Sequence, residues 1–214
     1  MHLVKFQNPQ PNFTQNRLLV DDNCGAIYGV EFDKNLSLED ALKVVKDEEK
    51  INVGLAGDKK ALSKMLLDVS SYPNKEEFAL VKSQINTGSS SIVFETVDGD
   101  VLKLTRGNHF PLNRPVESFD VPIDKKWEIG KTHIYKEEKL LTHSLCETFT
   151  GMVEELIKQS GYKVRDMGGT HQVGISDKYG RVFLLDPECA RYKTIFHAIF
   201  DKVIRFISSN KGKV

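Results

Sequence analysis

The spacing of hydrophobic residues changes along the chain, and the first third has the spacing of helices. Between Ser37 and Val69 the apolar residues recur every three or four positions, which is typical of helices that bury one face. This pattern predicts a helix that begins at Ser37, where Ser37 and Asp40 resemble a capping box, and a second helix over residues 58–69. Partial alternation over residues 25–32 predicts one short strand before them.

From residue 78 the apolar positions tend to alternate with polar ones, which is the period of β-strands. The clearest strands cover residues 92–97 and 101–105, because Asp98-Gly99 between them is a typical hairpin turn. Three further strands are predicted over residues 78–85, 119–123 and 132–135. Residues 78–135 are therefore expected to form a small antiparallel sheet of about five strands, in which residues 124–130 are a connection.

The last third of the chain combines helical spacing with one hairpin. An apolar stripe of helical period follows Ser144, and Ser144 with Glu147 again resembles a capping box. Strands over residues 172–175 and 181–185, joined by a polar turn, predict a β-hairpin. A strongly apolar helix is predicted over residues 192–207.

These elements predict an α+β protein in three parts. Residues 1–75 form an N-terminal extension with two helices, residues 76–140 a small antiparallel sheet lobe, and residues 141–214 a helical lobe that carries the hairpin. A chain of 214 residues is long enough to bury a substantial core in such an arrangement.

Composition and charge narrow the environment in which the chain works. The formal net charge is zero, so no global field attracts nucleic acid or an anionic membrane, and neither is expected as a partner. Cys24, Cys146 and Cys189 are odd in number and widely spaced, which argues against a disulfide framework and for a reducing compartment. No apolar run of about 18 residues is present, and the first twenty residues lack the pattern of a secretory signal. A cytoplasmic location is therefore expected.

Two aspartates stand at chain reversals at the same end of the predicted hairpin. Asp166 lies in the turn-rich loop before the first strand, and Asp186 ends the second strand. Carboxylates in such positions suit the binding of a hard cation such as Mg²⁺ and the orientation of a hydroxyl. Both also have ordinary structural interpretations, because aspartates are common near glycine turns and Asp186 could cap the turn into the next helix.

A lysine and a serine-rich turn precede this hairpin along the chain. Lys103 alternates with Leu102 and Leu104, so it is expected on the sheet face opposite to these apolar neighbours. A cation there can bind phosphate oxygens, although lysine in an exposed strand also protects a sheet edge. The turn consists of small residues that let backbone N–H groups approach a phosphate closely, or that simply form an ordinary loop: Gly88, Ser89, Ser90 and Ser91.

Taken in this order, these segments resemble the protein-kinase-like superfamily. Residues 88–94 and 101–105 look like the glycine-rich loop and the lysine strand. Residues 164–166 (Val-Arg-Asp) look like the catalytic-loop His-Arg-Asp, and residues 184–187 (Leu-Leu-Asp-Pro) look like the metal-binding Asp-Phe-Gly. The resemblance covers residues 78–188 and is best to small, divergent kinases of phages and bacterial effectors. It implies a two-lobed minimal kinase-like fold with an antiparallel N-lobe sheet, a reduced helical C-lobe and an N-terminal extension.

The resemblance also implies an activity, cofactors and site residues. The activity is an ATP- and Mg²⁺-dependent phosphotransferase, a minimal Ser/Thr protein kinase that acts on a protein of a host or partner cell. It would work in the bacterial cytoplasm or, for an exported effector or phage product, in the host cytosol. The implied catalytic residues are Asp166 and Lys103, and the implied metal ligands are Asp186 and His171. Nucleotide binding falls to Lys103 with Gly88, Ser89, Ser90 and Ser91.

The chain departs from the kinase pattern in three places. Gly88 is the only glycine in the phosphate loop, and His171 takes the position of the catalytic-loop asparagine. No helix between residues 106 and 119 supplies a glutamate for Lys103, and the candidates for that partner are Glu117, Glu39, Glu48 and Glu49. Three alternatives stay open: a catalytically inactive pseudokinase-like interaction module, a small-molecule (antibiotic-type) kinase, and an unrelated α+β phage or effector protein.

Overall fold

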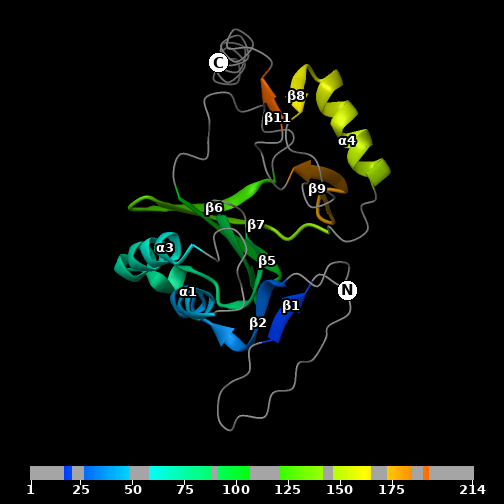
Figure 1. The fold of residues 1–214 in the computed structure, drawn as a ribbon. Coiled ribbons are helices and arrows are strands. Elements are labelled where there is room, and N and C mark those ends of the chain that lie inside the picture. Colours follow the sequence, from blue (N-terminus) through cyan, green and yellow to red (C-terminus); the bar gives the residue numbers. More distant parts are fainter. Residues whose placement is uncertain are drawn as a thin grey trace. The chain divides into compact units, whose positions relative to one another are not determined.

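Figure 1 shows the computed structural model of the chain, which describes residues 17–20, 27–48, 58–87, 91–106, 121–141, 147–164, 173–184 and 190–192. The chain divides into two compact units. Unit 1 comprises Met1–His109 and Ile123–Lys139, and unit 2 comprises Phe110–Pro122 and Leu140–Val214. Both units contain helices or helical turns together with antiparallel strands, so the chain is an α+β protein, as the sequence predicts.

Unit 1 is built on one seven-stranded sheet in the order β1-β2-β3-β4-β5-β7-β6. All neighbouring strands in it are antiparallel. The order follows the sequence except at the end, where β7 lies between β5 and β6. The bounds are β1 Arg17–Val20, β2 Ile27–Leu36, β3 Val81–Thr87, β4 Ser91–Thr96, β5 Asp100–Arg106, β6 Ile123–Ile129 and β7 Thr132–Glu138.

Two helices, α1 (Leu38–Asp47) and α3 (Lys59–Ser71), cover one face of this sheet (Figure 1). A short 3₁₀ helix, η1 (Lys75–Glu77), follows α3. The core between helices and sheet holds apolar side chains that are fully shielded from solvent, which is the main stabilising contribution to this unit. From the sheet these are Ile92, Phe94, Leu102, Leu104 and Ile134, and from the helices Leu42, Leu62 and Met65.

Local caps start both helices where the sequence predicts them. The Ser37 hydroxyl accepts a hydrogen bond from the Asp40 amide (3.1 Å) and donates one to the Asp40 carboxylate (2.8 Å). Asp58 Oδ1 accepts from the amides of Lys60 and Ala61 at 3.1 and 3.0 Å. These bonds satisfy amides that have no partner inside the helix, so both predicted helices are confirmed.

The predicted hairpin of β4 and β5 is confirmed, and the backbone conformation of its turn requires the glycine at position 99. Gly99 has φ of 90°, a conformation that residues with a Cβ rarely adopt. The Thr96 hydroxyl closes the turn by accepting from the Asp100 amide at 3.1 Å. This hairpin places β5, and with it Lys103, next to β4 in a defined register.

The prediction for residues 119–130 is wrong in its boundaries. The strand expected over residues 119–123 includes only Ile123 of β6 among the described residues, and the connection expected over 124–130 is mostly β6 itself. Trp127 and Ile129 are buried on the helical face, whereas the charged residues between and before them are exposed. The run of charged residues at the start of β6 concealed its alternation in the sequence.

Residues 1–75 contribute β1, β2, α1 and α3 to unit 1. Strand β2 pairs with β3, where Val30 lies opposite Gln84, and a Cβ on Gly29 would collide with the Gln84 carbonyl oxygen. Because these elements share the sheet and the core, the chain divides near residues 110–122 and after Lys139, and not at residue 75.

A buried polar contact ties α3 to the sheet. Asp68 Oδ2 accepts from Arg106 Nη1 at 2.9 Å and from the Thr132 hydroxyl at 2.7 Å, and Thr132 is fully buried. Gly130 has φ of 59°, and a Cβ on it would lie 2.6 Å from Asp68 Oδ1. The contact therefore links α3, β5 and β7 at one point.

Asp68→Ala is expected to lower the free energy of unfolding by about 1–3 kcal/mol, because it removes the acceptor for a buried hydroxyl and a charged partner of Arg106. Asp68→Asn keeps an acceptor oxygen and is expected to lower it less. Urea unfolding followed by the fluorescence of Trp127, the single tryptophan of the chain, measures both. Equal losses in the two variants would contradict this assignment.

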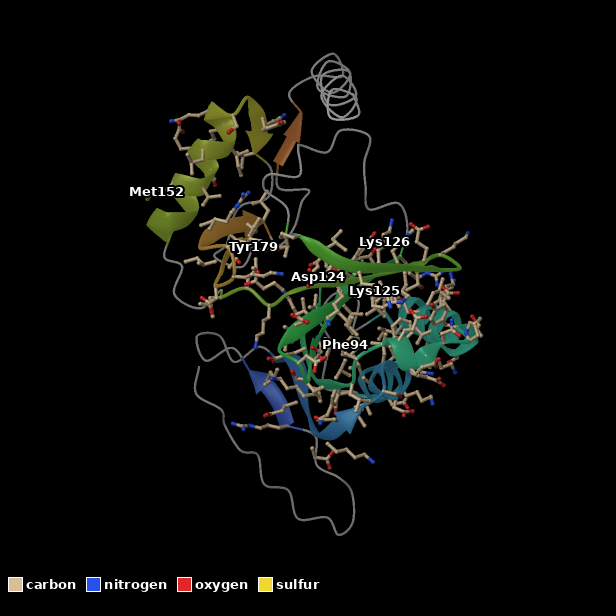
Figure 2. The ribbon with its side chains drawn as sticks, turned by 180° about the vertical axis from the view of Figure 1, so that it is seen from behind. Phe94, Asp124, Lys125, Lys126, Met152 and Tyr179 are labelled. Carbon is tan, nitrogen blue, oxygen red and sulfur yellow. The ribbon has the colours of Figure 1, made fainter. Side chains whose placement is uncertain are left out.

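The described part of unit 2 contains one helix and two small two-stranded antiparallel sheets, called ribbons below. Helix α4 (Glu147–Gln159) confirms the helix predicted after Ser144 and leads into β8 (Tyr162–Val164). Val153 and Ile157 on α4 are buried, whereas Met152 and Leu156 are 60% and 56% exposed (Figure 2). Strand β8 pairs with β11 (Ala190–Tyr192).

The second ribbon is the predicted β-hairpin, formed by β9 (Val173–Ser176) and β10 (Arg181–Leu184). A backbone bridge to Leu141 extends it, with N–H···O distances of 2.9 and 3.0 Å between Leu141 and Ile175. Val121, Leu140 and Phe183 form a small core there.

The structure describes only the first residue of the helix predicted over residues 192–207. Tyr192, expected to begin the C-terminal helix, lies in β11, and residues 193–207 of that helix lie outside the described residues.

No helix in the described part of the chain is long and apolar enough to span a bilayer.

Candidate functional site

The segments that contain the two candidate aspartates begin and end on the ribbons of unit 2. Asp166 and His171 lie in residues 165–172, and Asp186 lies in residues 185–189; both segments are outside the described residues. The strands that precede and follow them are described. Their registers therefore tell where each segment starts and where it ends.

Both segments start and end at paired residues. The first leaves β8 after Val164 and enters β9 at Val173, and the second leaves β10 after Leu184 and enters β11 at Ala190. Val164 is paired with Ala190, and Leu184 is paired with Val173. Paired Cα atoms of antiparallel strands lie about 5 Å apart, so each end of one segment lies beside an end of the other.

The aspartates occupy equivalent places in these segments. Asp166 comes two residues after the end of β8, and Asp186 comes two residues after the end of β10. The polar turn of the hairpin, residues 177–180, is exposed at the opposite end of β9 and β10. The turn therefore lies at the end of the hairpin opposite to Val173 and Leu184, where the two segments join it.

Lys103 lies in the middle of β5, between β4 and β7. Its cross-strand neighbours are Val93 and Tyr135. Leu102 and Leu104 point into the core under α1 and α3, so Lys103 lies on the other face, which we call the second face of the sheet. The expected alternation around Lys103 is confirmed.

Of the four residues of the predicted phosphate loop, the described part of the chain includes Ser91 alone. Ser91 is the first residue of β4 and is paired with Thr105 of β5, while Gly88, Ser89 and Ser90 lie outside the described residues. Since Thr105 is two residues from Lys103 on the same strand face, the end of the loop enters the sheet close to the lysine.

Glu95 is a buried carboxylate on the second face that sequence reasoning did not single out. It is 9% exposed, and its Oε1 lies 2.7 Å from Lys139 Nζ and 2.9 Å from Lys82 Nζ. Burial by itself raises the pKa of Glu95, but the hydrogen bonds and charges of Lys139 and Lys82 outweigh it, so this pKa lies below its ordinary value. The alternation of residues 92–96 places Glu95 on the face opposite to Ile92 and Phe94, but it gives no sign that this carboxylate is buried.

The described glutamates among the expected partners of Lys103, Glu39 and Glu48, lie on or at the end of α1 and not on the sheet face of the lysine. Glu39 on α1 accepts from Lys75 at 2.7 Å and forms an ion pair with Lys43 at 3.1 Å. The Lys75 and Lys43 contacts lower the pKa of Glu39 from 4.5 to about 2. Helix α1 packs on the face opposite to Lys103, and Glu48 is the C-terminal cap of that helix. Glu49 and Glu117 lie outside the described residues.

The lysines of β6 make contacts that stabilise the fold of unit 1. Lys125 donates to Glu77 at 2.8 Å, and Trp127 Nε1 donates to the same carboxylate oxygen at 3.1 Å. Lys126 Nζ lies over the ring of Tyr135 at 5.7 Å from its centroid. Figure 2 shows Lys125 and Lys126 next to each other on this strand.

In the described ranges, no group of three or more His, Cys, Asp and Glu side chains could hold a metal ion. The expected metal ligands Asp186 and His171 lie outside those ranges. By ligand chemistry alone, the carboxylate of Asp186 suits Mg²⁺, which prefers oxygen ligands and shares them with phosphate and water, better than the imidazole of His171 does. Comparison of the chain with known protein families, with curated proteins and with solved structures finds no match.

Proposed function

We propose that the chain is an ATP- and Mg²⁺-dependent phosphotransferase, a minimal Ser/Thr protein kinase that acts on a protein of a host or partner cell. The observation that carries this proposal is the strand register around residues 165–172 and 185–189. It brings both ends of the Asp166 segment next to the ends of the Asp186 segment. Phosphoryl transfer needs a metal ligand and a hydroxyl-orienting carboxylate near each other.

The reaction assigns one role to each group. The oxygen of a substrate Ser or Thr hydroxyl bonds to the γ-phosphorus of ATP, the bond from that phosphorus to the β–γ bridging oxygen breaks, and ADP leaves. Asp166 orients the hydroxyl and accepts its proton. Asp186, with His171, holds the Mg²⁺ that neutralises charge on the phosphate oxygens.

The position of Lys103 in the sheet supports the same proposal. Counted from β3, the strand before the Gly88–Ser91 turn, Lys103 lies on the third strand, which is where protein kinases carry the lysine that binds phosphates. Its strand lies inside the sheet, between β4 and β7. A lysine that only protects a sheet edge would lie on an outer strand.

A pseudokinase-like interaction module is the second candidate, and His171 is the observation that favours it. Kinases use an asparagine at this position for the second Mg²⁺. An imidazole is larger and binds Mg²⁺ less readily than a carbonyl oxygen does. A chain that lost this ligand could keep the fold without transfer.

Isothermal calorimetry with ATP and Mg²⁺, followed by mass spectrometry for autophosphorylation, tests the proposal. We expect ATP binding that EDTA weakens and incorporation of phosphate into Ser or Thr. Binding without incorporation, with or without candidate protein substrates, would favour the interaction module. Absence of binding at millimolar nucleotide would contradict the kinase proposal and support the interaction module.

A further inference from the structure

Three side chains form a row across the second face of the sheet in unit 1. Ser91 on β4 is paired with Thr105 on β5, and Thr105 is paired with His133 on β7. We call them the Ser91–Thr105–His133 row. It runs beside Lys103, which is two residues from Thr105 on the same strand and therefore about 7 Å away along it.

The hydroxyl of Thr105 is buried without a hydrogen-bond partner among the described residues. The residue as a whole is 3% exposed. In folded proteins the large majority of buried polar atoms are paired with protein or water. Valine has nearly the same shape and would fill this position without a hydroxyl, so the hydroxyl itself needs an explanation.

His133 repeats this feature on the next strand. Its Nδ1 atom is buried and has no hydrogen-bond partner in the described part of the chain. Glu128 Oε1, on the residue paired with His133 in β6, lies 3.7 Å from this nitrogen, and the stronger contact of Glu128 is with Lys126. The ring stacks on that of Tyr135, with the centroids 6.4 Å apart and the planes 9° from parallel. A buried imidazole nitrogen and a buried hydroxyl thus belong to paired residues of neighbouring strands.

The surroundings of the row favour an anionic ligand. Lys103 lies on the next row of the same face, and Ser91 directly follows Gly88, Ser89 and Ser90 in sequence. Two carboxylates on this face are already bound by lysines: Glu95 by Lys82 and Lys139, and Glu128, which is paired with His133 on β6, by Lys126. A threonine hydroxyl and a neutral imidazole N–H can both donate to phosphate oxygens.

We propose that Thr105 and His133 bind the phosphate chain of the nucleotide beside Lys103. This inference rests on the proposed phosphotransferase function and extends its nucleotide site to two residues outside the kinase-like motifs. A phosphate oxygen accepts from Thr105 Oγ1 and from the His133 ring, and the buried donors gain the partners that the free chain lacks.

Calorimetry on the full chain with Mg²⁺-ATP and with adenosine tests this assignment. Thr105→Val is expected to weaken ATP binding about tenfold, which is the loss for one hydrogen bond to a charged acceptor. Adenosine binding is expected to stay unchanged, because adenosine has no phosphate. Thr105→Ser keeps the hydroxyl and is the matched control, with ATP affinity expected within about twofold of the wild type.

His133→Phe gives a second, independent measurement, because it keeps a ring to stack on Tyr135 and removes both nitrogens. It is also expected to weaken ATP binding several-fold. The thermal midpoint of Thr105→Val without nucleotide should be no lower than that of the wild type, since the hydroxyl has no partner to lose.

The outcomes separate the two proposals. If the wild type binds ATP and Thr105→Val binds it equally well, the inference is overturned, a water molecule being the partner of the hydroxyl, while the proposed function stands. Equal weakening of ATP and adenosine would overturn the assignment to phosphate. If the wild type binds no ATP, the proposed function fails and the inference fails with it.

Discussion

Asp166→Ala is expected to lower the rate of phosphoryl transfer by about a hundred- to ten-thousandfold, the range that a positioned acid–base group contributes. ATP affinity is expected to change little, because Asp166 acts on the substrate hydroxyl and not on the nucleotide. Asp186→Ala is expected to abolish transfer as well, but through loss of Mg²⁺, so it should also weaken binding of Mg²⁺-ATP. Initial rates with γ-labelled ATP, combined with calorimetry, distinguish the two effects.

The hairpin itself supplies the matched control. Asp177 is an exposed carboxylate in the turn at the opposite end of β9 and β10. Asp177→Ala also removes one negative charge, but from the turn of the hairpin, and is expected to keep wild-type transfer. If Asp166→Ala and Asp186→Ala retained the activity of Asp177→Ala, the assignment of both aspartates would be wrong. If all three variants lost activity equally, the hairpin would be needed only for folding.

Phe94→Ala is expected to lower the free energy of unfolding of unit 1 by about 3–5 kcal/mol, because it opens a cavity in a closely packed core. Phe94 is fully buried and its ring lies 6.5 Å from that of Phe32 on β2. The side chain therefore packs β4 against β2 within unit 1. Figure 2 labels Phe94 within the sheet.

Urea unfolding followed by tryptophan fluorescence measures the unfolding free energy of unit 1, because Trp127 lies in that unit. Trp127 is the single tryptophan, and its ring packs edge-on against Phe78 at 5.1 Å in the same core. Leu67→Ala on α3 is the control, because Leu67 is 69% exposed and its loss should change the unfolding free energy by less than about 0.5 kcal/mol. A Phe94→Ala variant as stable as Leu67→Ala would show that this core does not hold unit 1 together.

Much of the secondary structure was predictable because its causes are local. The caps at Ser37 and Asp58 and the turn at Gly99 all act within a few residues, so short sequence patterns reveal them. Strand β6 was misplaced because Lys125, Lys126 and their charged neighbours hide its alternation. Only the burial of Trp127 against Phe78 shows which side of β6 faces the core.

The sequence predicted the sheet face of Lys103, but it did not predict which residues surround this lysine. Sequence reasoning placed Lys103 on the face opposite to Leu102 and Leu104, which the structure confirms. It could not find Glu95, Thr105 or His133, because each looks like an ordinary strand residue in the sequence. Their burial depends on strands that lie far away along the chain.

The sequence by itself determined the starts of α1 and α3 and the two hairpins, since each rests on contacts between residues close along the chain. The tertiary structure alone decided that β2 joins the sheet beside β3 and that β7 separates β5 from β6. It also decided that Asp68 binds Arg106 and Thr132, 38 and 64 residues away. Such contacts form only when distant segments bury apolar surface together, and no local pattern records that choice.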